Sequence, residues 1–118
     1  MKVIPFPSAP LADAAWEEVE AEKLVSGTPK RAWKLLYTSQ SEEFNTGIYE
    51  CTPGSWKVSY TEDEFCTLIE GTLKMTSDDG ETQEFKAPVS FVIPSGYNGT
   101  WEALTKLRKY FVIYEKAK

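Results

Sequence analysis

The stretch GIYECTPGSWKVSYTEDEFCTLIEG, residues 47–71, decides the fold of this chain. Runs rich in aromatic and β-branched residues alternate in it with turn formers such as Pro53. Within SWKVSY every second residue is apolar or aromatic, so Trp56, Val58 and Tyr60 share one face of an extended segment. The stretch therefore predicts successive short strands.

The same pattern continues on both sides of residues 47–71. Turn formers recur at short intervals, and Asp79-Gly80 is the strongest hairpin signal in the chain. Short strands without a long helix are typical of a β-sandwich or β-barrel. The nine predicted strands are AWKLLYT (32–38), NTGIYEC (45–51), SWKVSY (55–60), EFCTLIEG (64–71), TLKMTS (72–77), TQEFKA (82–87), SFVIP (90–94), GTWEAL (99–104) and RKYFVIYE (108–115).

The last of these runs is largely apolar or aromatic on both of its faces. A strand of this kind is usually covered on both sides, either by a second sheet or by a partner chain. One face carries Arg108, Tyr110, Val112 and Tyr114, and the other carries Lys109, Phe111 and Ile113.

Residues 1–30 are predicted to form an N-terminal extension of a single β-barrel domain that spans residues 31–118. The first twelve residues are rich in proline and are expected to be extended. Residues 13–27 could form one or two helical turns, with Asp13 as the N-cap and Gly27 at the end. A short strand near Val19 is the alternative.

The charge of the chain excludes several classes of partner. The net charge is −5, from 18 acidic and 13 basic residues, so neither nucleic acid nor an anionic membrane surface is an expected partner. No segment approaches the roughly 18 to 20 apolar residues of a membrane span. Three early prolines interrupt the N-terminus too soon for a signal-peptide core, which predicts a cytoplasmic protein.

The absence of histidine limits the chemistry more than any other feature. With no histidine among 118 residues, catalytic triads, Cys–His dyads and histidine metal sites are excluded. No cofactor is expected for the same reason. The two cysteines, Cys51 and Cys66, form no CxxC motif and are predicted to be free thiols.

One motif resembles the first motif of the cupin superfamily. Glu64 and Gly71 stand at the Glu-x6-Gly spacing of that motif. Val58 and Tyr60 stand where the motif has its two histidines. The upstream Gly54 lies closer to these positions than in the standard pattern. The motif is therefore shorter than the standard one and also lacks its two histidine ligands.

The second cupin motif is matched by Pro94-Ser95-Gly96, with Gly99 at the histidine position. The phrases around both motifs are similar to those of single-domain cupins of the ureidoglycine-aminohydrolase type. This resemblance implies an all-β, single-domain cupin jelly-roll barrel (a double-stranded β-helix) with a short N-terminal extension, and commonly a homodimer. It does not imply ureidoglycine hydrolysis, because those enzymes are longer two-domain cupins of a metal-binding type.

The cupin pattern turns Glu64 into the barrel, where an unpaired carboxylate would cost several kcal/mol. Glu64 is therefore either a catalytic or ligand-binding group or a structural residue paired with a lysine, arginine or tyrosine. Lys74 and Arg108 are possible partners. Tyr60 could bind a polar ligand through its hydroxyl group, or could fill the core. Cys66 lies two residues beyond Glu64 and should share its face.

Tyr97 and Trp101 flank Gly99 in the second motif. In cupins this region lines the mouth of the barrel, so the two rings could stack on a planar or sugar-like ligand. The alternative is that Trp101 fills the space that a metal site would otherwise occupy.

The sequence favours a metal-independent cupin that binds a small polar organic metabolite in its barrel. Glu64 is the candidate acid/base group, and Tyr60, Cys66, Tyr97 and Trp101 are the candidate ligand contacts. One alternative is a metalloenzyme with a carboxylate-rich site at Glu62, Glu64 and Cys66. Another is a non-catalytic interaction or sensor domain. A homodimer is expected in each case, through the extension or the first strands.

Overall fold

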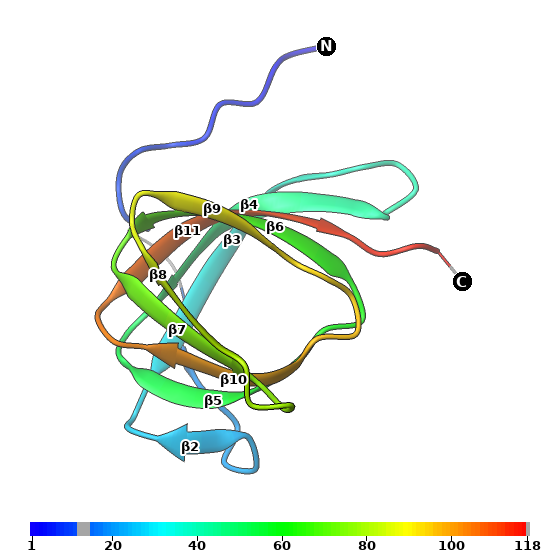
Figure 1. Ribbon diagram of the computed structural model, residues 1–118. Helices are drawn as coiled ribbons and strands as arrows, with labels where there is room; N and C mark the ends of the chain where they lie inside the picture. The colour runs from blue at the N-terminus through cyan, green and yellow to red at the C-terminus, as the bar shows by residue number, and fades with distance from the viewer. Residues whose placement is uncertain (12–14, 118) are drawn as a thin grey trace.

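The computed structural model describes residues 1–11 and 15–117. Its described residues form eleven strands in two antiparallel sheets, and the prediction of an all-β fold is confirmed. The two sheets curve around a common interior to form an open barrel (Figure 1). The described part of the chain contains no helix long and apolar enough to cross a membrane.

The six-stranded sheet has the strand order β1-β3-β4-β11-β6-β9, and the five-stranded sheet has the order β2-β5-β10-β7-β8. The strands of the first sheet are β1 (Glu17–Glu18), β3 (Lys30–Thr38), β4 (Phe44–Cys51), β11 (Leu107–Tyr114), β6 (Asp63–Glu70) and β9 (Val89–Ile93). Those of the second sheet are β2 (Leu24–Ser26), β5 (Gly54–Ser59), β10 (Asn98–Ala103), β7 (Thr72–Ser77) and β8 (Thr82–Lys86).

The hairpin predicted at Asp79-Gly80 is confirmed. Strands β7 and β8 pair in antiparallel register on either side of it, and Gly80 has a φ of 94°, in the left-handed region that glycine adopts without strain. The longer-range pairings follow the double-stranded β-helix order, with β11 between β4 and β6 and β10 between β5 and β7.

The helical turns predicted within residues 13–27 are wrong for the described residues. Strand β1 pairs with β3 and strand β2 pairs with β5, so the extension joins both sheets. The alternative of a short strand near Val19 comes closer, because β1 ends one residue before it. Asp13, the predicted N-cap, lies outside the described residues.

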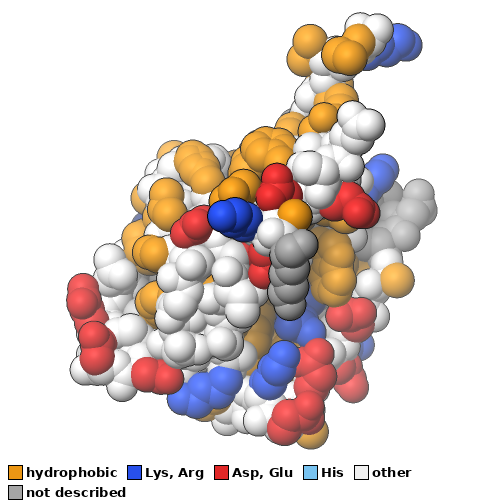
Figure 2. All heavy atoms as spheres, turned by 90° about the vertical axis from the view of Figure 1, so that its right-hand side faces the viewer, with side chains coloured by type: hydrophobic (Ala, Val, Ile, Leu, Met, Phe, Trp, Pro, Cys, Tyr) orange, Lys and Arg blue, Asp and Glu red, His pale blue; other side chains and the backbone are white. Residues whose placement is uncertain are grey.

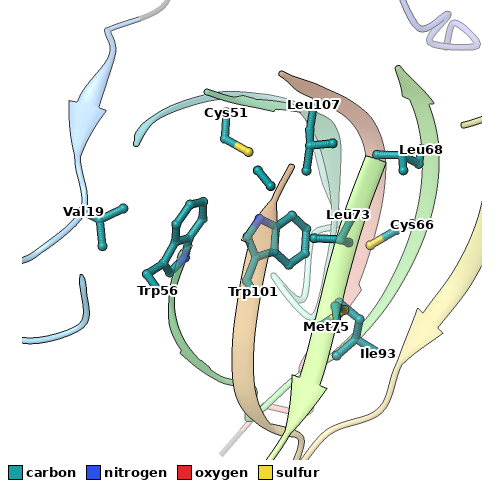
Figure 3. Close-up of a cluster of buried hydrophobic side chains, with 11 residues drawn as sticks. Val19, Cys51, Trp56, Cys66, Leu68, Leu73, Met75, Ile93, Trp101 and Leu107 are labelled. Atoms are coloured by element: carbon teal, nitrogen blue, oxygen red, sulfur yellow. The ribbon is translucent and has the colours of Figure 1, made fainter. Parts of the chain in front are cut away.

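The core lies between the inner faces of the two sheets. Trp56 and Trp101 stand side by side on neighbouring strands, with ring centroids 6.2 Å apart, and Val19 closes over Trp56 (Figure 3). Leu68 and Leu107 from the other sheet are fully buried. The extension adds a strand to each sheet instead of a helix, since β1 pairs with β3 and β2 pairs with β5.

Two glycines let neighbouring strands approach closely. A Cβ atom on Gly47 would lie 2.1 Å from the carbonyl oxygen of Lys34, and one on Gly99 would lie 2.2 Å from that of Thr76. Both distances are far shorter than any side chain tolerates, so both positions require glycine. The backbone that approaches Gly99 closely belongs to β7.

The N-terminal segment runs along the outer face of the six-stranded sheet. The guanidinium of Arg108 donates a hydrogen bond to the carbonyl of Ser8 at 2.8 Å, and the hydroxyl of Tyr110 donates one to the carbonyl of Pro7 at 3.1 Å. The backbone N–H of Leu11 donates to the buried carboxylate of Glu50 at 2.6 Å. These contacts fix residues 7–11 against β11 and β4, and we call residues 6–11 the docked arm.

Candidate functional site

A cavity of about 640 Å³ opens between the inner faces of the two sheets. Its lining comes mainly from β3, β4, β5, β6, β10 and β11, because the inward positions of these strands converge there. Phe111 lines it, together with five further aromatic side chains and one buried ion pair. They are Trp33, Tyr49, Trp56, Tyr60 and Trp101, together with Glu64 and Lys109.

The ion pair joins two neighbouring strands of the six-stranded sheet. A carboxylate oxygen of Glu64 on β6 lies 2.6 Å from the Nζ atom of Lys109 on β11. Both side chains are nearly completely buried, with 6% and 5% of their surfaces exposed. An ion pair at this distance in a poorly hydrated site is a strong charge-assisted hydrogen bond.

Two aromatic rings enclose the ammonium group of Lys109. Its Nζ atom lies 4.6 Å from the ring centroid of Trp101 and 4.9 Å from that of Tyr49. The negative faces of the rings attract a cation at these distances. Glu64, Trp101 and Tyr49 together hold the ammonium in place from three strands.

The net electrostatic effect keeps Lys109 charged. Burial alone would lower its pKa, but the nearby thiol of Cys66 and carboxylate of Glu64 outweigh burial and raise the pKa well above the ordinary value. We attribute the rise to the carboxylate, because burial keeps the thiol neutral. Burial also raises the pKa of Tyr60 and of Tyr49.

Cys66 shares the face of Glu64, as its spacing predicts. Its Sγ atom lies 3.1 Å from the carboxylate of Glu64, to which it donates, and 3.5 Å from Nζ of Lys109. The thiol is buried and is not among the side chains that line the cavity. The thiol therefore contacts the carboxylate of Glu64 on the side that faces away from the cavity.

The prediction that both cysteines are free thiols is confirmed. Burial raises the pKa of Cys51 to about 11 and that of Cys66 to about 12. At pH 8 only about one Cys66 thiol in ten thousand is then ionised, whereas about one in ten is ionised at the ordinary thiol pKa of 9.0.

We therefore expect both thiols to resist 5,5′-dithiobis(2-nitrobenzoate) at pH 8 in the native protein and to react readily in 6 M guanidinium chloride. The release of the coloured thiolate measures the reaction. Rapid reaction of either thiol in the folded protein would contradict this arrangement.

The predicted ligand contacts divide between two cavities. Tyr60 and Trp101 line the large cavity with Glu64. Tyr97 instead lines a second cavity of about 360 Å³, with Met75, Phe85, Phe91 and Ile93 among its neighbours. The rings of Tyr60 and Tyr97 contact each other edge to face, with centroids 6.3 Å apart, where the two cavities approach.

Sequence reasoning missed Lys109 as the partner of Glu64. Arg108 points to the opposite side of the sheet, where it lies 3.5 Å from Glu50, and Lys74 alternates with the inward residues of β7. Neither possible partner therefore approaches Glu64. The alternation of β11 was the available signal, since it places Lys109 on the same face as Phe111.

The side chains at the cupin motif positions do not fit a metal ion. Val58 and Gly99 offer no ligand atom, Tyr60 holds its proton because its pKa is raised, and the carboxylate of Glu64 is held by Lys109. At the alternative site, the side chains of Glu62, Glu64 and Cys66 do not converge on one position where a metal ion could bind. Among residues 1–11 and 15–117, no group of three or more acidic or cysteine side chains could hold a metal ion.

Comparison with known structures supports the cupin fold. A Pseudomonas syringae protein of unknown function from the DUF861 family has a TM-score of 0.77 at 17% identity, over 87% of this chain and 45% of that chain. The Clostridium difficile EutQ protein has a TM-score of 0.64 at 22% identity, over 73% of this chain and 63% of that chain. This chain therefore spans less than two thirds of the length of either protein.

A third structure matches along nearly its whole length. A putative ethanolamine utilization protein Q from Salmonella typhimurium has a TM-score of 0.65 at 20% identity, over 89% of this chain and 98% of that chain. No curated protein sequence matches the chain significantly. At these identities the structures establish the fold alone.

The family follows from the sequence match. Residues 38–111, more than half of the chain, match the family described as EutQ-like cupin domain. This match confirms the cupin superfamily, whereas the ureidoglycine-aminohydrolase type stays a prediction. The protein therefore belongs to the EutQ-like cupin domain family.

Proposed function

We propose that this protein binds a small polar organic metabolite in the large cavity, in direct contact with Glu64 and Lys109. The observation that carries the proposal is a buried carboxylate–ammonium pair in the wall of an open aromatic cavity. Sites of this composition, with apolar walls and a few convergent polar groups, are typical of small-molecule binding.

A purely structural role for the pair explains less. Removing two charges from water costs several kcal/mol per ion, and apolar residues of similar size are often as stabilising or more so. The surrounding side chains are aromatic and could pack against an apolar pair. Ionisable groups retained at such a cost in a cavity are candidates for a functional site.

The pair suits a ligand that accepts a hydrogen bond from Lys109. The ammonium can donate to a carbonyl, hydroxyl or carboxylate oxygen, and the carboxylate of Glu64 can accept from a ligand hydroxyl or N–H. An amine such as ethanolamine, which the Salmonella relative's name suggests, would bring a second cation beside Lys109. The site therefore favours an oxygen-rich ligand over a primary amine.

The same pair could support acid/base chemistry. Glu64 would accept a proton from the ligand, and the Lys109 ammonium would stabilise the negative charge that develops on the ligand oxygen. Both residues are aligned on neighbouring strands, so the geometry would need little rearrangement.

The free thiols of Cys51 and Cys66 suit a reducing compartment, and we place the protein in the cytoplasm.

The test is a ligand screen followed by substitution of Glu64. We expect at least one member of a panel of hydroxy acids, keto acids, ureides and sugars to raise the melting temperature. Glu64→Gln should weaken its binding by about 10- to 100-fold, since a hydrogen bond to a charged group contributes about 1.5–3 kcal/mol. Isothermal titration calorimetry measures the change.

Glu62→Gln is the matched control, because Glu62 lies outside the set of residues that line the cavity. It should bind the same ligand as tightly as the wild type. Unchanged binding by Glu64→Gln together with increased stability would refute the proposal and leave the carboxylate a structural residue. A panel without any binder would instead favour the interaction or sensor domain.

A further inference from the structure

The second cavity lies where the two sheets separate along one side of the barrel. Strand β9 ends the six-stranded sheet and β8 ends the five-stranded sheet, so among the described residues one edge of each strand has no neighbour. Residues 87 and 88 connect the two strands, which diverge from this connection (Figure 1). The cavity of about 360 Å³ is lined from both of the diverging strands.

The interior of the second cavity is apolar and aromatic. The rings of Phe85 on β8 and Phe91 on β9 stack across the gap between the sheets, with centroids 4.3 Å apart. Met75 and Ile93 are buried core residues, 3% and 2% exposed, and close the inner end. The volume lies within the roughly 300–1,000 Å³ of small-molecule sites, whose walls are also mainly apolar.

One inward-facing position shows that this cavity can be reached from solvent. Gln83 lies directly opposite Met75 in the pairing of β8 with β7, so both side chains lie on the face that lines the interior. Met75 is buried, whereas Gln83 is exposed. A ligand can therefore enter beside Gln83, since no described strand covers this edge of β8.

The rim of the second cavity is acidic. Among the described residues that line it, Asp79 and Glu81 are acidic and none is basic. Neither carboxylate forms an ion pair with a described residue. Burial raises the pKa of the Tyr97 hydroxyl, and three nearby carboxylates raise it further. They belong to Asp79, Asp78 and Glu81, so negative charge acts on this wall of the cavity.

The large cavity has the opposite charge. Basic residues outnumber acidic ones in its lining, which contains Lys23, Arg31, Lys57 and Lys109 with Glu64 and Asp78. The edge-to-face pair of Tyr60 and Tyr97 lies where the two cavities approach. On the face in Figure 2, acidic side chains lie at the left margin next to hydrophobic ones, and basic side chains gather toward the lower middle. The two cavities therefore suit ligands of opposite charge.

We propose that the second cavity binds an organic ammonium ion with an aromatic or aliphatic body. The body lies against the stacked rings of Phe85 and Phe91, and the ammonium group faces Asp79 and Glu81 at the rim. The faces of aromatic rings also attract a cation, so the walls and the rim favour the same ligand. The ammonium has three donors, and backbone carbonyls along the free edges of β8 and β9 are further acceptors.

A titration of ¹⁵N-labelled protein with 2-phenylethylamine, followed by nuclear magnetic resonance, tests the proposal. This probe is an ammonium ion at neutral pH, and we expect saturable shifts of the backbone amides of β8, β9 and the turn at Asp79. The neutral 2-phenylethanol has a similar shape and should bind about tenfold more weakly, and phenylacetate more weakly still. Equal binding of the amine and the alcohol, or no saturable shift at these amides, would overturn the proposal.

The double variant Asp79→Asn, Glu81→Gln removes the negative charge of the rim. Asparagine keeps an oxygen that can accept from the backbone N–H of Glu81, as the carboxylate does at 3.2 Å. The double variant should bind 2-phenylethylamine about fivefold or more weakly, since exposed charge pairs contribute modestly. Gln83→Lys places a cation at the rim and should weaken binding as well. Both positions of the double variant and Gln83 are exposed, and circular dichroism checks that the fold is kept.

Glu84→Gln is the matched control. Glu84 is exposed on the same strand but lies outside the lining of the cavity, so its loss should leave the affinity unchanged. An equal loss in Glu84→Gln and in the double variant would show only a general effect of net charge and would refute the acidic rim. Unchanged affinity in the double variant and in Gln83→Lys would refute it too.

Glu64→Gln separates this site from the one proposed in the large cavity. Because Glu64 does not line the second cavity, the variant should bind 2-phenylethylamine as tightly as the wild type. Loss of amine binding in Glu64→Gln would place the amine in the large cavity and overturn the second site. The outcome does not depend on a ligand for the large cavity, so either proposal can fail while the other stands.

Discussion

Replacing Lys109 by methionine is expected to lower the free energy of unfolding by about 3–5 kcal/mol. Methionine has a similar length and can pack between Trp101 and Tyr49, so little volume is lost. The loss arises because the side chain of Glu64, only 6% exposed, remains without its partner at 2.6 Å. Urea denaturation of wild type and variant at pH 7 measures the difference.

The double variant Glu64→Gln, Lys109→Met is the decisive control. It removes both charges, so most of the lost stability should return. Lys57→Met tests the loss of a lysine as such, because Lys57 is exposed and has no ion pair among the described residues. Equal instability of the single and double variants would show that the pair does not stabilise the fold.

The same variant has a defined dependence on pH. The folded-state pKa of Lys109 is raised above its ordinary value of 10.5. The stability that the ion pair contributes is therefore complete below pH 10.5 and is lost as the pH rises through the folded-state pKa. The difference in stability between wild type and Lys109→Met should therefore stay constant near neutral pH and shrink in strongly alkaline solution.

Trp101→Ala is expected to cost about 3–5 kcal/mol of the free energy of unfolding, because it removes one of the two buried indoles of the core. The indole packs on Trp56 and Tyr49, with centroids 6.2 Å away in both cases. It also covers the ammonium of Lys109 at 4.6 Å, so part of the cost falls on the ion pair. Thermal and urea unfolding measure the change.

Trp33→Ala is the matched control for the loss of an indole. Trp33 also lines the large cavity, but it is 48% exposed, so its removal should cost far less. If Trp101 only filled space, Trp101→Phe would recover most of the stability that Trp101→Ala loses, because phenylalanine would also cover the ion pair. A cost below about 1 kcal/mol for Trp101→Ala would contradict a core role.

The strands could be predicted from the sequence because their signals are local, whereas the choice of a barrel over a sandwich came from the resemblance to cupins. The alternation around Trp56 and the turn at Asp79-Gly80 reflect the geometry of single strands and hairpins, which neighbouring residues determine. The shared face of Glu64 and Cys66 followed from the same period of two, whereas the inward position of Glu64 was implied by the resemblance to cupins. These relations need no knowledge of which strands become neighbours.

The partner of Glu64 could not be predicted in this way. Lys109 lies 45 residues further along the chain and reaches Glu64 only because β11 pairs with β6. A register shift between Arg108 and Lys109 also alters this pairing, and no local signal indicates it. The short strands of the extension were missed for a related reason, since Glu17 pairs with the distant Arg31.

The position of β11 has a consequence for synthesis on the ribosome. This strand follows every other strand in the chain, yet it lies in the middle of its sheet, between β4 and β6. Its residue Arg108 also holds Ser8, across 100 residues of sequence. Until β11 leaves the exit tunnel, the nascent chain exposes two unpaired strand edges and an unanchored N-terminus. Completion of the barrel therefore waits for β11, and folding that depends on contacts so distant in sequence is intrinsically slow.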